Sequence, residues 1–164
     1  MNNNILNQKG LTLIELLASL IITITLSFFA FNLLSKGLDH YENIKSTNSL
    51  RDEGDYLMAV LVKEIYTTKE TEISTFPDKY SNRNYFIVTN SGSTYKTGFE
   101  NGRLLIHGDL FNTSNKNISI SNNSTLEKVD NGLYKINLIL INKKRNNEIQ
   151  FENEIRTIND KEDS

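Results

Sequence analysis

The chain has 164 residues, of which 38% are hydrophobic and 23% are charged, which leaves room for one membrane segment and one modest domain. Its formal net charge of −2 argues against broad nucleic-acid binding, because that function needs a basic surface. The chain has no cysteine, which excludes disulfides, zinc–thiolate sites and thiol nucleophiles. An exported domain of this composition must therefore be held together by packing.

Residues 1–10 are polar and include one basic side chain, Lys9. The positive-inside tendency places this end on the cytoplasmic side of a membrane. An ordinary secretory signal has an apolar region of about 7 to 15 residues, followed by a small-x-small cleavage site. The apolar run in this chain is longer, and Ala30-Phe31-Asn32 is no such site. The plain alternative to a processed leader is an uncleaved signal anchor.

Residues 11–34 form an apolar run that carries a single charged side chain, Glu15. About 20 apolar residues suffice for a helix to cross a bilayer, so this run predicts one transmembrane helix. A lone carboxylate at the centre of such a helix costs roughly 2.5 to 3.5 kcal/mol on the insertion scale, and less near an end. A partner group that neutralises the Glu15 carboxylate is therefore expected.

The segment Lys9-Gly10-Leu11-Thr12-Leu13-Ile14-Glu15-Leu16-Leu17 resembles the prepilin signal of type IV pilins and of the pseudopilins of type II secretion and DNA-uptake systems. The resemblance implies that a membrane peptidase cuts after Gly10 and that the new amino terminus, on Leu11, is N-methylated. It also puts Glu15 at the fifth mature position, where this family has a glutamate. The family more often has Phe at the place of Leu11.

Cleavage after Gly10 would create a positive amine on Leu11, and helices packed in a filament can bring that amine to the Glu15 carboxylate. Removing one partner of a buried ion pair typically costs about 3 to 5 kcal/mol, so such a pair fixes the register of neighbouring subunits. We therefore expect Glu15 to act in filament assembly.

The helical period continues beyond residue 34 and becomes amphipathic, with Leu38, Tyr41 and Ile44 on one face. This apolar face is expected to be covered by another surface. Gly54 costs about 1 kcal/mol relative to alanine in a helix, which makes a kink plausible there. The apolar stripe then resumes, and the pattern predicts a helix, bent or straight, over residues 11–68. Residues 50–56 and 63–65 resemble the second helical half of the J- and W-type minor pilins. A solvated acidic turn followed by a core stripe explains the same residues.

Short runs of β-branched and aromatic residues follow residue 68 and predict strands. The predicted strands are 72–76, 85–89, 94–99, 103–107, 118–121, 126–129, 133–141 and 149–157. Two Asn-Gly pairs, at 101–102 and 131–132, indicate tight hairpin turns. The last four strands are expected to pair sequentially and antiparallel. Residues 112–117 read as a polar loop.

No residue pattern indicates catalysis, a metal site or a cofactor. His40 and His107 lack the spacing of metal ligands, and His107-Gly108-Asp109 is better explained as a turn than as a base with an orienting acid. No phosphate-binding loop or nucleophile elbow is present. The cluster 143–145, two lysines and an arginine, predicts a solvated hairpin tip, and its charge gives only weak support for contact with DNA.

The sequence thus predicts an α+β, pilin-like fold, in which a long N-terminal helix packs on a small antiparallel β-sheet. The expected parts are a leader (1–10), a transmembrane and filament-core helix (11–34), an amphipathic stem (35–68), an antiparallel β domain (69–158) and a flexible tail (159–164). The expected function is that of a minor pilin or pseudopilin, a structural subunit and not an enzyme.

Its expected partners are prepilin peptidase, major and minor pilins, the assembly platform and membrane lipid. The chain would cross the cytoplasmic membrane once, with the amino terminus inside and the domain outside, before it enters a pilus or pseudopilus. The rival interpretation is an uncleaved, signal-anchored extracytoplasmic binding module or adhesin.

Overall fold

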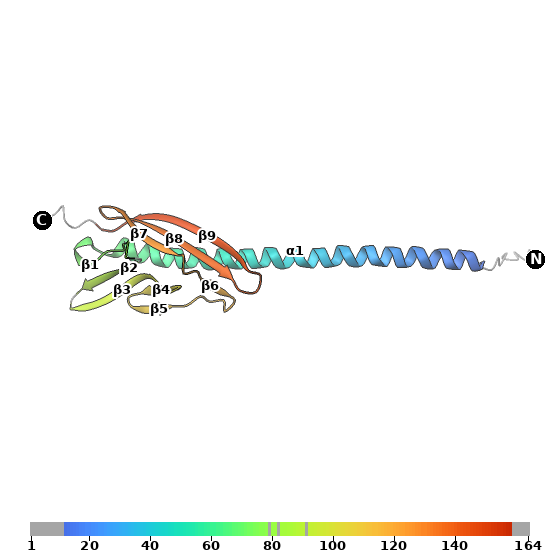
Figure 1. The fold of residues 1–164 in the computed structure, drawn as a ribbon, viewed down its shortest axis with the longest axis horizontal. Coiled ribbons are helices and arrows are strands. Elements are labelled where there is room, and N and C mark those ends of the chain that lie inside the picture. The colour runs from blue at the N-terminus through green and yellow to red at the C-terminus, as the bar shows by residue number, and fades with distance from the viewer. Residues whose placement is uncertain (1–11, 79, 82, 91, 159–164) are drawn as a thin grey trace, which may run out of the picture. The chain divides into compact units, whose positions relative to one another are not determined.

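A computed structural model of the chain describes residues 12–78, 80, 81, 83–90 and 92–158 (Figure 1). The leader, the tail, and with them Gly10 and Leu11 lie outside the described residues. Within these residues, one α-helix is followed by a short 3-10 helix and nine strands. Their bounds are α1 Leu13–Thr67, η1 Glu70–Glu72, β1 Ile73–Thr75, β2 Asn84–Asn90, β3 Ser93–Glu100, β4 Arg103–Ile106, β5 Asp109–Phe111, β6 Ile118–Ile120, β7 Thr125–Asp130, β8 Leu133–Asn142 and β9 Asn147–Arg156.

The chain divides into two compact units, Met1–Asn43 and Ile44–Ser164. The first unit contains the apolar part of α1, and the second contains the rest of α1 together with every strand. The 55 residues of α1 form one helix that is uninterrupted at Gly54, and its bounds agree with the predicted 11–68. The long apolar run and the amphipathic run after it thus belong to a single helix.

The first five strands form one antiparallel sheet in sequential order, β1-β2-β3-β4-β5. The predicted turn between β3 and β4 is confirmed, with Asn101 and Gly102 at φ of 53° and 68°. These positive angles suit a two-residue hairpin loop, which is why Asn-Gly is favoured there. A second turn of this kind, at His107 and Gly108, leads into β5, a strand that the sequence did not predict.

The remaining strands form a second sheet around β8, so the domain holds two sheets where one was expected. The expected sequential pairing is wrong for β6, which pairs with β8 and not with β7. Both β6 and β7 lie along one edge of β8, and β9 pairs with the other edge. Two hydrogen bonds hold the 121–124 turn to Ile139 of β8: the Ser121 amide donates to the Ile139 carbonyl at 2.8 Å, and the Ile139 amide donates to the Ser124 Oγ at 3.0 Å. The turn thus stays on the same edge of β8, and the chain continues along that edge.

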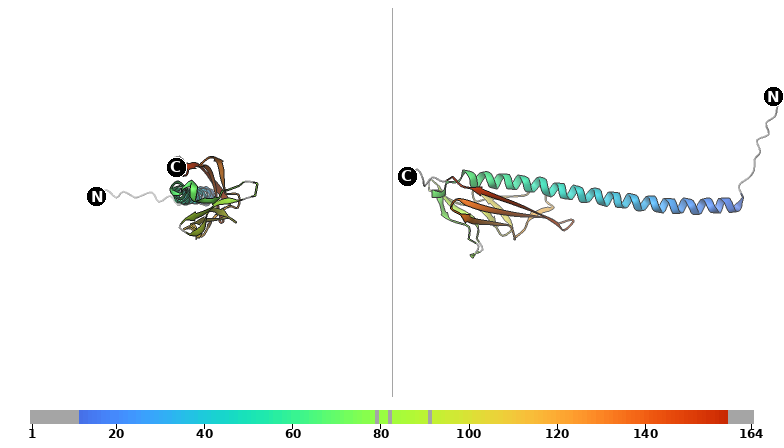
Figure 2. Two further views of the ribbon diagram at one scale, coloured as in Figure 1. Left: turned by 90° about the vertical axis from the view of Figure 1, so that its left-hand side faces the viewer. Right: turned by 90° about the horizontal axis from the view of Figure 1, so that it is seen from above.

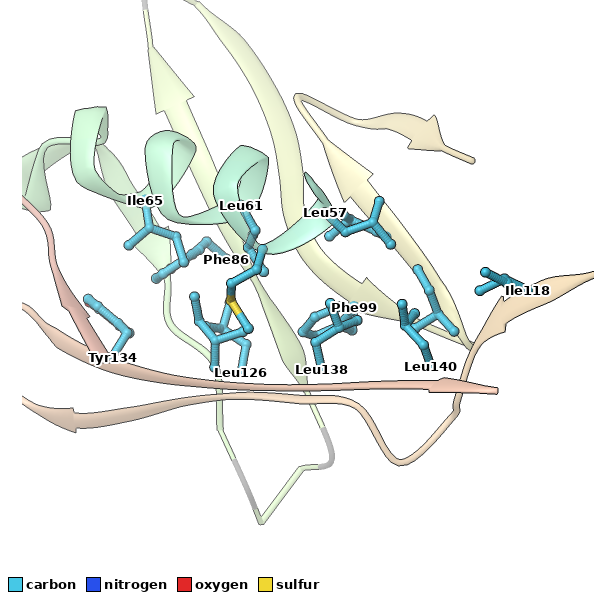
Figure 3. Close-up of a cluster of buried hydrophobic side chains, with 14 of the residues drawn as sticks. Leu57, Leu61, Ile65, Phe86, Phe99, Ile118, Leu126, Tyr134, Leu138 and Leu140 are labelled. Carbon is cyan, nitrogen blue, oxygen red and sulfur yellow. The ribbon is translucent and has the colours of Figure 1, made fainter. Parts of the chain in front are cut away.

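One hydrophobic core joins the second unit, and both sheets lie on the same side of its part of α1 (Figures 2 and 3). The helix contributes residues at three- and four-residue steps, the spacing of one helical face. Its buried side chains include Leu50, Leu57, Leu61 and Ile65. The sheets contribute alternate residues of their inner faces, such as Phe86, Phe99, Leu126, Tyr134, Leu138 and Leu140. One face of the stem helix and the inner faces of both sheets therefore share one core.

Candidate functional site

The first turn of α1 holds Glu15, the one predicted site residue that the structure describes. Its Oε2 accepts hydrogen bonds from the backbone N of Thr12 at 2.9 Å and from the Thr12 Oγ1 at 2.8 Å. The Glu15 amide in turn donates to the Thr12 Oγ1 at 3.3 Å. This reciprocal pattern is a capping box, in which a Thr and a Glu three residues later satisfy free N–H groups at a helix start. Glu15 therefore has a structural role within its own chain.

The spacing Thr-x-x-Glu before an apolar run is the sequence signal of a capping box, and sequence reasoning missed it here. The Glu15 carboxylate was assigned only to the amine of Leu11, which lies outside the described residues, as does Gly10. Both roles use the same carboxylate. They differ in what they require, because the cap needs an acceptor oxygen and the ion pair needs a negative charge.

The apolar segment after Glu15 satisfies its polar side chains internally. The hydroxyls of Ser19, Thr23, Thr25 and Ser27 each donate at 2.8 Å to a carbonyl three or four residues earlier. The side-chain amide of Asn32 donates to the carbonyl of Phe28 at 2.9 Å. Internal hydrogen bonds let polar side chains lie in hydrocarbon without a water partner. The four hydroxyl groups therefore donate within the helix, which suits a segment surrounded by lipid or by other helices.

The same segment exposes its large apolar side chains on all sides. Between Leu13 and Leu34 their exposed fractions run from 53% to 85%. The helix is long and apolar enough to cross a membrane once, near the amino terminus. This geometry is compatible with single-pass membrane anchoring.

The stem face that was expected to be covered is open in the single chain. Leu38, Tyr41 and Ile44 are all exposed, each by about 60% of its surface. Polar side chains occupy the opposite face, where a shallow depression is lined by Lys36, Asp39, His40 and Asn43. This small apolar stripe is available for packing against another surface.

The stem segment that resembles minor pilins contains one buried acid, Glu53. Its Oε1 accepts the backbone N–H of Ser114 at 2.8 Å, and Asn115 donates from Nδ2 to the Ser49 hydroxyl at 2.9 Å. The other charged side chains between residues 50 and 56, Arg51, Asp52 and Asp55, are exposed. Glu53 therefore fastens the loop between β5 and β6 to the stem, a role that the sequence pattern did not reveal.

His107 pairs with a residue that the sequence did not connect to it. Its Nε2 lies 2.7 Å from the Oε1 of Glu64, whose side chain is only 11% exposed. The His107 amide donates to the Thr97 Oγ1 at 3.2 Å, and the ring of Tyr95 meets the imidazole edge-on, with 4.8 Å between ring centroids. The expected turn at His107 is confirmed. The His107 side chain reaches the stem, where Glu64 is its acidic partner.

Burial raises the pKa of Glu64, and the nearby His107 partly offsets this by lowering it. Burial also raises the pKa of the Tyr95 phenol, and the charges of Glu64 and Glu72 raise it further. These groups form a polar contact between the stem and the β4–β5 turn. Within the described part of the chain, no three His, Cys, Asp or Glu side chains gather as metal ligands would.

The basic cluster of the sequence lies where it was expected, in the turn between β8 and β9. Lys143 and Lys144 are exposed, and Arg145 is half-buried.

Comparison of the chain with models of protein families, with curated proteins and with solved structures found no match.

Proposed function

We propose that this protein is a minor pilin or pseudopilin, a structural subunit that primes or joins a thin extracytoplasmic filament. It is made as a precursor, cut after Gly10 by a prepilin peptidase and N-methylated on Leu11. Its partners are the other major and minor pilins and the assembly platform. The observation that carries the proposal is the resemblance of the Lys9–Leu17 segment to a prepilin signal, with Glu15 in the first turn of a single 55-residue helix.

Two further observations support assembly. The apolar part of α1 satisfies its own polar side chains, so it can leave lipid for a bundle of helices without exposing unpaired polar groups. The stem beyond it exposes Leu38, Tyr41 and Ile44, a stripe that neighbouring subunits would cover.

The capping box favours one aspect of the rival interpretation, an uncleaved and membrane-anchored binding module or adhesin. A capped helix start explains why Glu15 is tolerated at the edge of the apolar run without any filament. Substitutions of Glu15 are therefore needed to distinguish a role in the helix cap from a role in filament assembly.

Two substitutions make this separation. Glu15→Gln keeps an acceptor oxygen for the cap and loses the charge, whereas Glu15→Leu loses both. If Glu15 pairs with the amine of Leu11 in the assembling bundle, both variants insert and are processed normally but fail to recover sibling pilins. Deleting one partner of a buried pair typically costs about 3 to 5 kcal/mol, enough to lower recovery by more than tenfold.

The experiment is to express each variant with its sibling pilins, confirm its membrane level and leader removal, and measure co-purification and filament number on cells. Thr12→Ala serves as the matched control, because it weakens the cap and leaves the Glu15 charge in place. Normal assembly in Glu15→Gln, combined with loss in Thr12→Ala, would assign Glu15 to the cap and not to an ion pair with Leu11. An intact leader and no recovery of sibling pilins by the natural protein would support the rival.

A further inference from the structure

The turn between β8 and β9 is fixed beside Ser46, near the point where α1 enters the second unit. The side-chain amide of Asn142 donates to the Ser46 Oγ at 2.8 Å, and the Ser46 hydroxyl lies 3.2 Å from the Oδ1 of Asn147. Asn142 and Asn147 are the last residue of β8 and the first of β9. The base of the turn is thus hydrogen-bonded to the stem.

The direction of the turn follows from three contacts with the stem, two made by β9 and one by Ile158, which follows it. Asn147 meets Ser46, Phe151 meets Gly54, and the Ile158 amide donates to the Thr68 carbonyl at 3.2 Å. Residue numbers therefore increase in the same direction along β9 and along the helix. The turn projects past Ser46 toward the end of the stem at which the chain enters this unit, and the β7–β8 turn lies at the opposite end of the sheet (Figure 1).

Two loops bring lysines together at this end. Lys143 and Lys144 in the turn are exposed, and the Lys143 amide donates to the carbonyl of Asn117 at 2.8 Å, next to exposed Lys116. The Asn142 Oδ1 accepts the amides of Lys144 and Arg145 at 2.9 and 3.2 Å, which holds the turn in shape. The nearest acid along β9 is the exposed Glu148. We call Lys116, Lys143 and Lys144 the lysine cluster.

We propose that the lysine cluster binds the anionic headgroups of the phospholipid bilayer that anchors the chain. Ser46 follows the end of the apolar run, Leu34, by about 12 residues, which as regular helix span roughly 18 Å. This tether bounds the distance of Ser46 from the hydrocarbon whatever orientation the second unit takes. The headgroup layer on each side of a bilayer takes up about 5 to 7 Å of this distance.

The remaining distance from Ser46 to the headgroups is on the order of 12 Å at most, and the turn and its lysine side chains lie beyond Ser46 at the end of the stem where the chain enters this unit. Charge attraction acts over a Debye length of about 8 to 10 Å at ordinary salt. Each lysine near an anionic surface strengthens attachment by roughly fivefold. Three lysines therefore suffice to hold this end of a tethered unit against anionic lipid. The proposal depends on membrane insertion and not on filament assembly.

Nucleic acid is the less favoured ligand for the same charges. The full chain has a net charge of −2, and no aromatic side chain interleaves with the basic residues of the turn. A bilayer, in contrast, is within reach in every anchored molecule.

The absence of cysteine from the chain allows a clean test, because a single introduced thiol can be labelled. The full chain carrying Asn117→Cys is labelled with an environment-sensitive fluorophore and reconstituted in phosphatidylcholine vesicles that contain a headgroup-attached spin quencher. Matched vesicles also contain about 30 mol% phosphatidylglycerol. Asn131→Cys, an exposed site in the β7–β8 turn, serves as the label control. Flotation and resistance to alkaline extraction confirm insertion.

We expect quenching at position 117 to be about twofold stronger in the anionic vesicles, and this difference to disappear in about 0.5 M salt. Replacing the three residues of the lysine cluster by glutamine should abolish the difference, and replacing them by arginine should preserve it. The control variant Lys63→Gln, Arg103→Gln, Arg156→Gln removes three exposed charges elsewhere in the same unit and should leave the difference intact.

Equal quenching in neutral and anionic vesicles by an inserted protein would overturn the proposal, and so would equal losses in the two glutamine triples. Binding of a fluorescent DNA duplex that depends on the lysine cluster, without any effect of phosphatidylglycerol, would reassign the surface to nucleic acid. None of these outcomes depends on sibling pilins, so failure here is distinct from failure of the proposed function.

Discussion

The ring of Phe151 on β9 lies directly over Gly54 of α1, so close that a Cβ at position 54 would overlap the ring. Gly54 is thus a packing residue in an uninterrupted helix, where its sequence had suggested a kink. A glycine in a helix lets another backbone or a large side chain approach closely. The cost of that glycine to the helix is offset by the contact between the stem and the second sheet.

The second unit is expected to fold without the apolar segment. Its sheets, its core and the buried helix residues that complete the core all lie between Ser46 and Thr157. A fragment that begins at Lys36 should therefore be soluble and monomeric, with a far-UV circular dichroism spectrum that contains both helix and strand. A disordered or wholly helical spectrum would contradict the architecture.

In that fragment, Gly54→Ala should lower the free energy of unfolding. Overpacking of a close contact typically costs about 1 to 3 kcal/mol, which exceeds the gain of up to about 1 kcal/mol from better helix propensity. Urea denaturation measures the difference. Gly37→Ala is the matched control, because a Cβ there would meet no atom within 4 Å.

The control should be neutral or slightly stabilising, as should Gly54→Ala in a Phe151→Leu background, where the ring no longer fills the space. Stabilisation by Gly54→Ala in the natural background would mean that Phe151 does not pack on the stem.

Glu64 should make stability depend on pH. Burial raises the pKa of its carboxyl, so the folded protein holds this proton to higher pH than the unfolded chain does. The contribution of Glu64 to the free energy of unfolding therefore falls as pH rises through the raised pKa. Glu64→Gln removes this titration and keeps an acceptor for the His107 Nε2. Relative to the natural fragment, the variant should gain stability as pH rises from about 4.5, the ordinary glutamate value, through the raised pKa of Glu64.

Thermal melts of both proteins across this range provide the measurement. His107→Ala is the companion variant, because losing the imidazole removes the attraction that lowers the Glu64 pKa and shifts the effect to higher pH. A stability difference between the natural fragment and Glu64→Gln that is the same at every pH would show that Glu64 is not desolvated in the folded state.

The sequence predicted the elements whose signal is local. The helix bounds, the Asn101–Gly102 hairpin and the basic turn between β8 and β9 all follow from periodicity and turn chemistry. The three-residue strand β5 was missed because Asp109–Phe111 is too short to show an alternating pattern.

The errors concern contacts between distant residues. The pairing of β6 with β8 is accompanied by contacts of Ser121 and Ser124 with Ile139, which no local sequence pattern signals. The Glu64–His107 contact joins residues from the stem and a turn in the same way. The capping box of Thr12 and Glu15 is local and could have been found, since its spacing is visible in the sequence.

Processing at Gly10 is the step on which the proposed function depends first. A peptidase that cuts after Gly10 must approach the backbone closely, so a bulky residue there should block removal of the leader. We expect Gly10→Leu to accumulate at full length in the membrane and to be absent from filaments. Leu11→Phe, which restores the commoner residue of the family, should be processed normally.

The most direct measurement is the mass of the amino-terminal peptide of the membrane-extracted protein, isolated from cells that contain its own peptidase. The account predicts a peptide that begins at Leu11 with one added methyl group, and an intact leader in Gly10→Leu. An intact Met1–Gly10 segment on the unmodified protein, or a Gly10→Leu protein still shortened by ten residues, would contradict it.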